Sequence, residues 1–303
     1  MKVASFYRFL DLEGPEAFKS ALQEVCEKHG LLGTVLVAQE GFNGSLTGAQ
    51  DGILGVFDWI ERTLSIDEPI EARWNEVSEA PFRRMRVRLK KEIVALGRPD
   101  ILPHKRTGTY VSGEKWNELI ENPNVVVIDT RNSYEFEVGT FPNAIDPETD
   151  SFRQFPEFAE KLAETSKDKP LAMFCTGGIR CEKATALMLE LGFNEVYHLQ
   201  GGILKYLEEM PEDENRWDGE CFVFDTRVAV DRDLAEGGYV QCHACRRPLS
   251  TEDMASPDYQ EGVSCPKCIN EVDEERRAGL RERQKQVELA RERGDEHIGQ
   301  KLP

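Results

Sequence analysis

The chain has 303 residues and a formal net charge of −18 at pH 7, and this length suits two or three domains better than a single core. The acidic balance argues against indiscriminate nucleic-acid binding, because the average field repels a phosphate backbone, but the first 100 residues carry only −3 of this charge. No window approaches the roughly 18 uncharged apolar residues of a membrane span, and the N-terminus lacks the features of a signal peptide. We therefore expect a cytoplasmic protein that does not enter a membrane.

The first third of the chain predicts alternating strands and helices. Residues 2–10 favour a strand, 15–30 a helix with proline near its start and glycine past its end, and 33–48 two strands around a glycine-rich turn. A second helix follows over 49–64, and 71–77 and 82–96 supply further extended chain. The order β-α-β-β-α-β predicts a ferredoxin-like split βαβ domain over residues 1–100.

A basic stripe is predicted on the last of these strands. Met85, Val87 and Leu89 alternate with the four residues that we call the basic stripe, Arg84, Arg86, Arg88 and Lys90. The stripe is either a solvated edge that resists aggregation or a surface for a polyanion, since arginine suits phosphate. We expect it to contact RNA.

From about residue 105 the pattern changes to a parallel α/β domain. Strands are predicted over 125–131, 170–178 and 195–203, with helices around 113–121, 152–165 and 181–191. Functional groups in such sheets gather at the carboxyl ends of the strands. Cys175 lies at one of these ends.

The residues after Cys175 predict an activated thiol. The loop consists of Cys175, Thr176, Gly177, Gly178, Ile179 and Arg180, and a helix opens near Cys181. Its glycines let successive N–H groups converge on the sulfur. These amides, the helix N-terminus and Arg180 all favour a thiolate, so we expect Cys175 to be nucleophilic.

The loop length and a second motif resemble a rhodanese domain spanning about 105–210. Four residues separate Cys175 from Arg180, one fewer than in a phosphatase cradle, and the second motif is "IDTRNSYEFEVGTFPNAI". The resemblance implies that Asp129 lies at a strand end near the active-site loop. "GTFPNAI" departs from the usual rhodanese sequence, so the substrate-side edge is modified. Cys181 is either a resolving thiol for Cys175 or a small apolar residue of the first helical turn.

The C-terminal part, residues 211–303, predicts a metal module and a charged helical tail. An acidic stretch with a proline, 207–220, is a plausible linker into it. The metal ligands are expected to be two C-x2-C pairs separated by 19 residues, Cys242, Cys245, Cys265 and Cys268. This pattern favours a structural zinc site over redox-active dithiols. Cys26 and Cys221 are expected to be buried small residues.

Together these parts, an α/β and α+β multidomain chain with "EGFNGS", "FCTGGIRCEKA" and "YVQCHACRRPLS…GVSCPKC", look like the bacterial oxygen-dependent tRNA uridine hydroxylases. The resemblance implies 5-hydroxylation of uridine 34, the wobble base in the anticodon region of tRNA, with dioxygen as co-substrate and Cys175 as the catalytic cysteine. No flavin, haem or non-haem iron motif is present in the sequence. Two other hypotheses stay open: a sulfurtransferase that carries a persulfide on Cys175, and a non-enzymatic RNA- or protein-binding adaptor.

Overall fold

The structure is a computed structural model that describes residues 1–294; the end of the predicted charged tail, 295–303, lies outside the described residues. Its contacts define two compact units. The first comprises Met1–Ser133 and Phe141–Arg216, and the second comprises Tyr134–Thr140 and the chain from Trp217 onward. Within residues 1–294, no helix combines the length and the apolar character that crossing a membrane requires.

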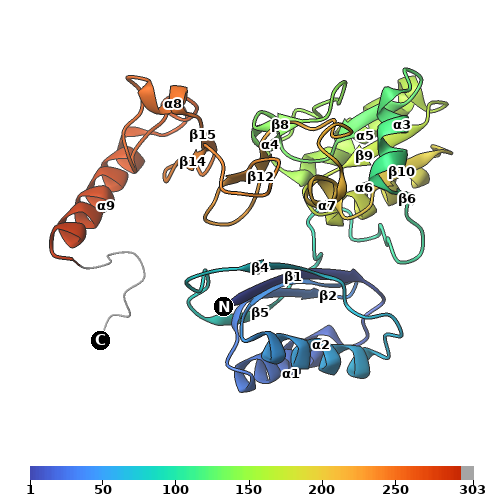
Figure 1. Cartoon of the computed structure of the whole chain (residues 1–303), viewed down its shortest axis with the longest axis horizontal. Coiled ribbons are helices and arrows are strands. Elements are labelled where there is room, and N and C mark those ends of the chain that lie inside the picture. The colour runs from blue at the N-terminus through green and yellow to red at the C-terminus, as the bar shows by residue number, and fades with distance from the viewer. Residues whose placement is uncertain (295–303) are drawn as a thin grey trace. The chain divides into compact units, whose positions relative to one another are not determined.

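The N-terminal part forms an antiparallel sheet covered by helices. Its elements are β1 (Lys2–Phe9), α1 (Pro15–Lys28), β2 (Leu32–Ala38), β3 (Gly41–Gly48), α2 (Gln50–Leu64), β4 (Ala72–Glu76) and β5 (Met85–Leu89). The strand order is β4-β1-β3-β2-β5, and only the added edge strand β5 runs parallel to its neighbour, β2. Both helices lie on the same face of this sheet (Figure 1). The predicted ferredoxin-like arrangement is confirmed.

Apolar side chains at helical spacing explain why these helices pack on the sheet. Phe18, Leu22 and Cys26 are the buried residues of α1, and they share one face of the helix because they recur every four residues. Phe57 of α2 meets Phe6 of β1 edge to face at 4.8 Å between ring centroids. The expectation that Cys26 is a buried small residue is therefore correct.

The second part of the first unit is a parallel α/β domain. Its main elements are β6 (Thr109–Val111), α3 (Gly113–Glu121), β7 (Val126–Asp129), α5 (Phe155–Ser166), β9 (Leu171–Phe174), α6 (Ile179–Glu190), β10 (Val196–Leu199) and α7 (Gly202–Glu209). A 3-10 turn, Phe152–Gln154, is a shorter piece of this domain, and α4 (Ser133–Phe136) crosses the boundary into the second unit. The sheet order is β6-β10-β9-β7, with every pairing parallel. The predicted parallel sheet is confirmed.

Two local predictions differ from the structure in their bounds, although the boundary between the two units, after Arg216, does lie within the predicted linker 207–220. Helix α6 begins at Ile179, two residues earlier than expected, because Gly178 ends the loop with a φ of 95° and can precede the helix directly. The predicted linker 207–220 begins inside α7. Its next residues are docked, since the Glu214 carbonyl accepts a hydrogen bond from Asn117 at 2.8 Å and Arg216 pairs with Glu121 at 3.0 Å.

Over its described residues, the second unit consists of short strands and helices. Its elements are β8 (Gly139–Thr140), β11 (Asp218–Gly219), β12 (Cys221–Phe222), β13 (Ala229–Val230), β14 (Val240–Gln241), β15 (Pro248–Leu249), α8 (Thr251–Ala255) and α9 (Glu274–Glu292). Strand β8 joins this unit because it pairs with β11. Cys221 is fully buried, as expected. Only Gln284 and Ala290 of α9 are buried, which agrees with the predicted charged helix.

Candidate active site and metal centre

Cys175 follows the last residue of β9, at the carboxyl end of the parallel sheet. All four residues of β9 are buried, and the Cys175 side chain is only 1% exposed. The beginning of α7 holds the loop from the other side, because Ile203 N–H donates to the Cys175 carbonyl at 2.9 Å. Gly202 is required at this approach, since a Cβ there would lie 2.5 Å from the same carbonyl oxygen. The cysteine is thus fixed between a strand end and a helix start.

The loop supplies groups that favour the thiolate form. Gly178 N–H donates to the Cys175 sulfur at 3.1 Å. Burial raises the pKa of Cys175, but this effect is outweighed by a hydrogen bond from the Cys181 thiol, the positive charge of Arg180 and backbone hydrogen bonds from Cys181 and Gly178, which together lower the pKa to about 6. Most Cys175 side chains are therefore ionised at neutral pH.

Of the other predicted loop residues, Thr176 to Gly178 form the loop and Ile179 and Arg180 already belong to the first turn of α6. Arg180 is 7% exposed, and its guanidinium donates to the Thr176 hydroxyl at 3.4 Å. Gly177 has open space around its Cα, so sterics do not require glycine there. Ile179 begins α6 and packs beside Phe9 and Ile93.

Cys181 lies in the first turn of α6, fully buried beside Cys175. Its sulfur is 3.5 Å from the Thr130 hydroxyl. Burial raises the pKa of Cys181 well above its usual value, and the hydrogen bond to Cys175 and the charge of Cys175 raise it further. At neutral pH the pair therefore consists of one thiolate, on Cys175, and one thiol that donates to it.

Asp129 ends β7 beside the Cys175 strand, as the resemblance implies. Its register partner is Phe174, the residue before Cys175. The carboxylate does not point freely into the site, because it holds Arg131 through two bonds of 2.9 and 2.6 Å, with both side chains fully buried. Arg131 also lies over the Phe174 ring at 5.9 Å. Asp129 thus supports the strand end beneath the loop.

Residues of the N-terminal sheet reach the same loop, which the sequence does not predict. The Tyr7 hydroxyl of β1 donates to Glu182 of α6 at 2.7 Å. A Cβ on Gly178 would lie 2.9 Å from that hydroxyl, so Tyr7 lies against the Cys175 loop. The hydroxyl of Tyr110 of β6 also acts on Glu182, because it lowers the pKa of that carboxyl group.

A buried ion triad follows one residue later in α6. Lys183 Nζ is 2.6 Å from Glu40 and 2.7 Å from Glu92, and all three side chains are almost completely buried. Glu40 opens "EGFNGS" and Lys183 lies in "FCTGGIRCEKA", the two motifs that carried the resemblance. Helix 179–190 holds four charged residues, and the lysine near its middle was the available sequence signal for this contact, but it does not identify the partners.

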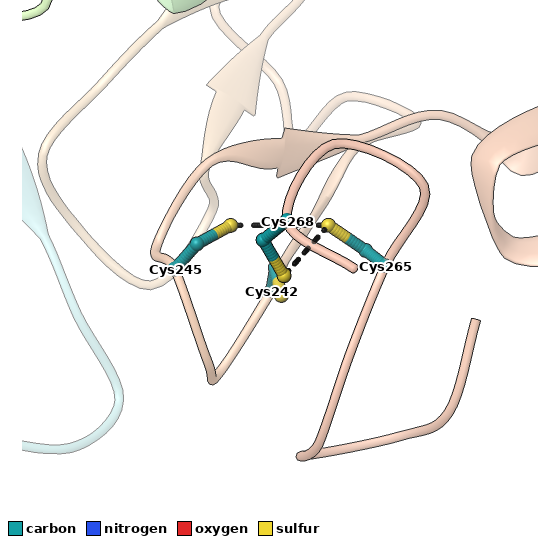
Figure 2. Close-up of side chains that lie close together, drawn as sticks. All are labelled: Cys242, Cys245, Cys265 and Cys268. Atoms are coloured by element: carbon teal, nitrogen blue, oxygen red, sulfur yellow. Dashed lines mark hydrogen bonds between the residues drawn. The ribbon is translucent and has the colours of Figure 1, made fainter. Parts of the chain in front are cut away.

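The four predicted metal ligands converge in the second unit (Figure 2). Their sulfur atoms all lie within 4.8 Å of one another, and every residue except Cys245 is buried. The separations are 3.8 Å for Cys245 and Cys265 and 3.5 Å for Cys265 and Cys268. Sulfurs on one tetrahedral zinc ion, each about 2.3 Å from the metal, are about 3.8 Å apart. The cluster could hold a metal ion such as zinc.

Backbone hydrogen bonds form the two turns that present these sulfurs. Arg246 N–H donates to the Cys242 carbonyl at 2.8 Å, and Cys268 N–H donates to the Cys265 carbonyl at 3.0 Å. A hydrogen bond from the Cys245 thiol, opposed by burial and aided by backbone amides, lowers the pKa of Cys242 to about 4. One thiolate is thus available before a metal binds.

The basic stripe lies on β5, the edge strand of the N-terminal sheet. Arg84, Arg88 and Lys90 are exposed and Arg86 is half-buried. On the other face Val87 is buried, but Leu89 is 43% exposed, because the sheet core ends before it. The predicted alternation of basic and apolar side chains is therefore present over most of the strand.

Comparisons with known proteins agree with both parts of the first unit. Residues 1–93 match the model of the UPF0176 acylphosphatase like domain, and residues 112–209 match the Rhodanese-like domain. A rhodanese-related protein from Thermoplasma volcanium is 27% identical over 33% of this chain and 92% of its own, with a TM-score of 0.28.

Full-length relatives extend this agreement to the second unit. The tRNA uridine(34) hydroxylase of Teredinibacter turnerae is 49% identical over 98% of this chain and 92% of its own length. The proteins of the same name from Agrobacterium fabrum and Rhizobium leguminosarum bv. trifolii are 49% and 50% identical over 98% of this chain, with 94% and 96% of their own lengths covered. Since about half of the residues are identical over 98% of this chain, which includes both units, the chain belongs to the tRNA uridine(34) hydroxylase family.

Proposed function

We propose that this chain hydroxylates carbon 5 of uridine 34 in tRNA, consuming dioxygen, with Cys175 as the reactive residue. The observation that carries the proposal is the 49% identity over 98% of the chain to a relative named tRNA uridine(34) hydroxylase. The site adds a chemical reason, because its surroundings lower the pKa of Cys175 to about 6 and a thiolate is a strong nucleophile. A cytoplasmic location follows from this substrate.

Within this proposal Arg180 and Cys181 keep Cys175 ionised. Arg180 contributes a positive charge and Cys181 a hydrogen bond. If Cys175 is oxidised to a sulfenic acid, with dioxygen as the oxidant, the neighbouring Cys181 thiol attacks that sulfur, which forms a disulfide and releases water. The loop residues Thr176, Gly177, Gly178 and Ile179 and the strand-end residue Asp129 position the sulfur.

The basic stripe is proposed to bind the tRNA backbone around the anticodon. Its exposed arginines offer planar donors that suit phosphate oxygens. Cys175 is only 1% exposed, so the wobble base must enter the site by turning out of its stack, as bases do in other enzymes that modify them. Phosphate contacts would hold the anticodon loop while the base turns.

We also propose that the four-cysteine cluster holds zinc with a structural role. Four cysteine ligands leave no open position for water or substrate, so such an ion stabilises the module and does not catalyse. Cys242, Cys245, Cys265 and Cys268 would be its ligands.

The experiment is mass spectrometry of tRNA nucleosides from cells that lack the gene and are complemented with wild type or C175S. Wild type should restore 5-hydroxyuridine derivatives at position 34, and C175S should not. Loss of thiolated nucleosides in the deletion strain, with hydroxylated ones intact, would instead indicate persulfide transfer. No change in either class would leave only a binding role.

A further inference from the structure

Glu182 is a half-buried carboxylate next to the Cys175 loop, and the proposed function gives it no role. It lies in the first turn of α6, seven residues after Cys175, and its backbone N–H donates to the Gly178 carbonyl at 3.2 Å. Gly178 is also the residue whose own N–H donates to the Cys175 sulfur. The carboxylate and the thiolate are therefore attached to one short, rigid stretch of backbone.

A tyrosine of the N-terminal sheet holds this carboxylate. Tyr7 of β1 donates to it at 2.7 Å, and the hydroxyl of Tyr110 of β6 lies close enough to lower its pKa. The backbone of Glu182 is held as well, because its carbonyl accepts from the Thr107 hydroxyl at 2.9 Å. A carboxylate that accepts a hydroxyl donor is better oriented than a free surface glutamate.

The negative charges of Glu182 and Cys175 disfavour each other. Burial raises the pKa of Glu182, the hydroxyls of Tyr7 and Tyr110 lower it, and the charge of Cys175 raises it, so that the result is a raised pKa. The electrostatic coupling of two acids is mutual, so a carboxylate that is disfavoured by the thiolate disfavours the thiolate equally. The Cys175 charge also raises the pKa of Tyr7, after burial and Glu182, which agrees with the position of Tyr7 against the loop.

The other charged or titratable groups around the pair are few. They come from β1, β6, α6 and β10, and they are Tyr7, Arg8, Tyr110, Arg180, Cys181 and His198. Arg180 favours the thiolate and Arg8 favours the Glu182 carboxylate. His198 packs on the Tyr110 ring at 4.2 Å, and burial lowers its pKa to about 4, so it carries no charge near neutral pH.

We infer that Glu182 is a positioning residue that restrains the ionisation of Cys175, and that the N-terminal sheet controls it through Tyr7. This inference takes Cys175 as the reactive residue, as in the proposed function. A consequence is that the ferredoxin-like part does more than bind RNA. A shift of β1 that removed the Tyr7 hydroxyl from Glu182 would favour the neutral carboxyl group of Glu182. The loss of that negative charge would in turn favour the thiolate form of Cys175. Contact between a ligand and the N-terminal sheet could thereby change the reactivity of the cysteine.

The test measures the pH dependence of iodoacetamide labelling of Cys175 in the full-length purified protein. Trypsin separates the two neighbouring thiols, because it cleaves after Lys167 and Arg180 and so releases residues 168–180 with Cys175 as their only cysteine. The variants are E182Q, which keeps the size and a hydrogen-bond acceptor but removes the charge, and Y7F, which keeps the ring but removes the hydroxyl. E190Q is the matched control, since Glu190 is an exposed carboxylate at the end of the same helix.

In E182Q the labelling midpoint should move to lower pH, with several-fold faster labelling below pH 6, the value to which the loop lowers the Cys175 pKa. Y7F should move it in the same direction by less, and E190Q should leave it unchanged. A purely structural role of Glu182 would change the amount or overall rate of labelling but not its midpoint. An unchanged midpoint in E182Q, with folding verified by circular dichroism, would overturn the inference.

The same measurement separates this inference from the proposed function. If C175S still restored 5-hydroxyuridine in cells while E182Q shifted the labelling midpoint, the proposed role of Cys175 would fail and the role of Glu182 would stand. If C175S abolished hydroxylation while the E182Q midpoint did not move, the reverse would hold.

Discussion

Replacing Lys183 with methionine should destabilise the first unit strongly, because it leaves two buried carboxylates without their cation. Lys183 contacts Glu40 at 2.6 Å and Glu92 at 2.7 Å, and its own side chain is fully buried. Methionine keeps the length and apolar stem of lysine but removes the charge. Breaking a buried ion pair by removing one partner costs about 3–5 kcal/mol, which corresponds to a fall in melting temperature of about 10 °C for a unit of this size.

The loss of stability in K183M should also depend on pH. Burial raises the pKa of Glu40, and the hydrogen bond and charge of Lys183 partly oppose this; without Lys183 the pKa rises further. An acid whose pKa is raised in the folded state contributes stability below its unfolded pKa and loses it as pH rises through the folded value. The deficit of K183M should therefore be large at neutral pH and shrink as pH falls towards that of the unfolded carboxyl group.

The assay is thermal unfolding followed by circular dichroism at neutral and mildly acidic pH. Lys161→Met is the matched control, because Lys161 forms an exposed pair with Glu157, and such surface pairs contribute about 0–1 kcal/mol. Adding E40Q to K183M should recover part of the stability, since glutamine keeps an oxygen for the Ile93 N–H that Glu40 accepts at 2.6 Å. Equal melting temperatures for K183M and K161M at both pH values would refute the reasoning.

Three further predictions concern the active cysteine, the metal cluster and the basic stripe. C175S should reduce 5-hydroxyuridine at position 34 to background with little change in melting temperature, and a C175S variant with wild-type hydroxylation would contradict the assignment of Cys175. R180Q should raise the pH midpoint of Cys175 labelling, because a positive charge is lost. C245S should lower the zinc content from one equivalent per chain, as measured by elemental analysis. It should also loosen the second unit while sparing the first, as measured by hydrogen exchange. Wild-type protein that is prepared without chelators and lacks metal would disprove the site. Replacing the three arginines of the basic stripe with glutamine should weaken tRNA binding. It should also reduce the salt dependence of log K, where K is the binding constant for tRNA, by about 0.9 for each duplex phosphate that the protein no longer neutralises. An unchanged salt slope in a binding titration would show that the stripe is only a solvated edge.

The sequence alone determined the features that depend on short stretches of chain. The apolar strand, glycine pair and arginine around Cys175 predict its place at a strand end, because strand period and loop conformation depend on neighbouring residues. The two C-x2-C turns predict a common site for the same reason, since each turn presents its two sulfurs locally. The order of strands and helices was enough to predict the folds of both parts of the first unit.

Tertiary structure decided what surrounds the cysteine. Tyr7 and Glu182 are 175 residues apart, and Lys183 is 143 residues from Glu40, so no local pattern indicates that they meet. In the sequence these residues look like ordinary polar side chains, and only the packing of β1 and of the turn before β3 beside α6 brings them together. Burial makes these contacts matter, because a charge that water would screen at the surface acts strongly on its neighbours once water is excluded.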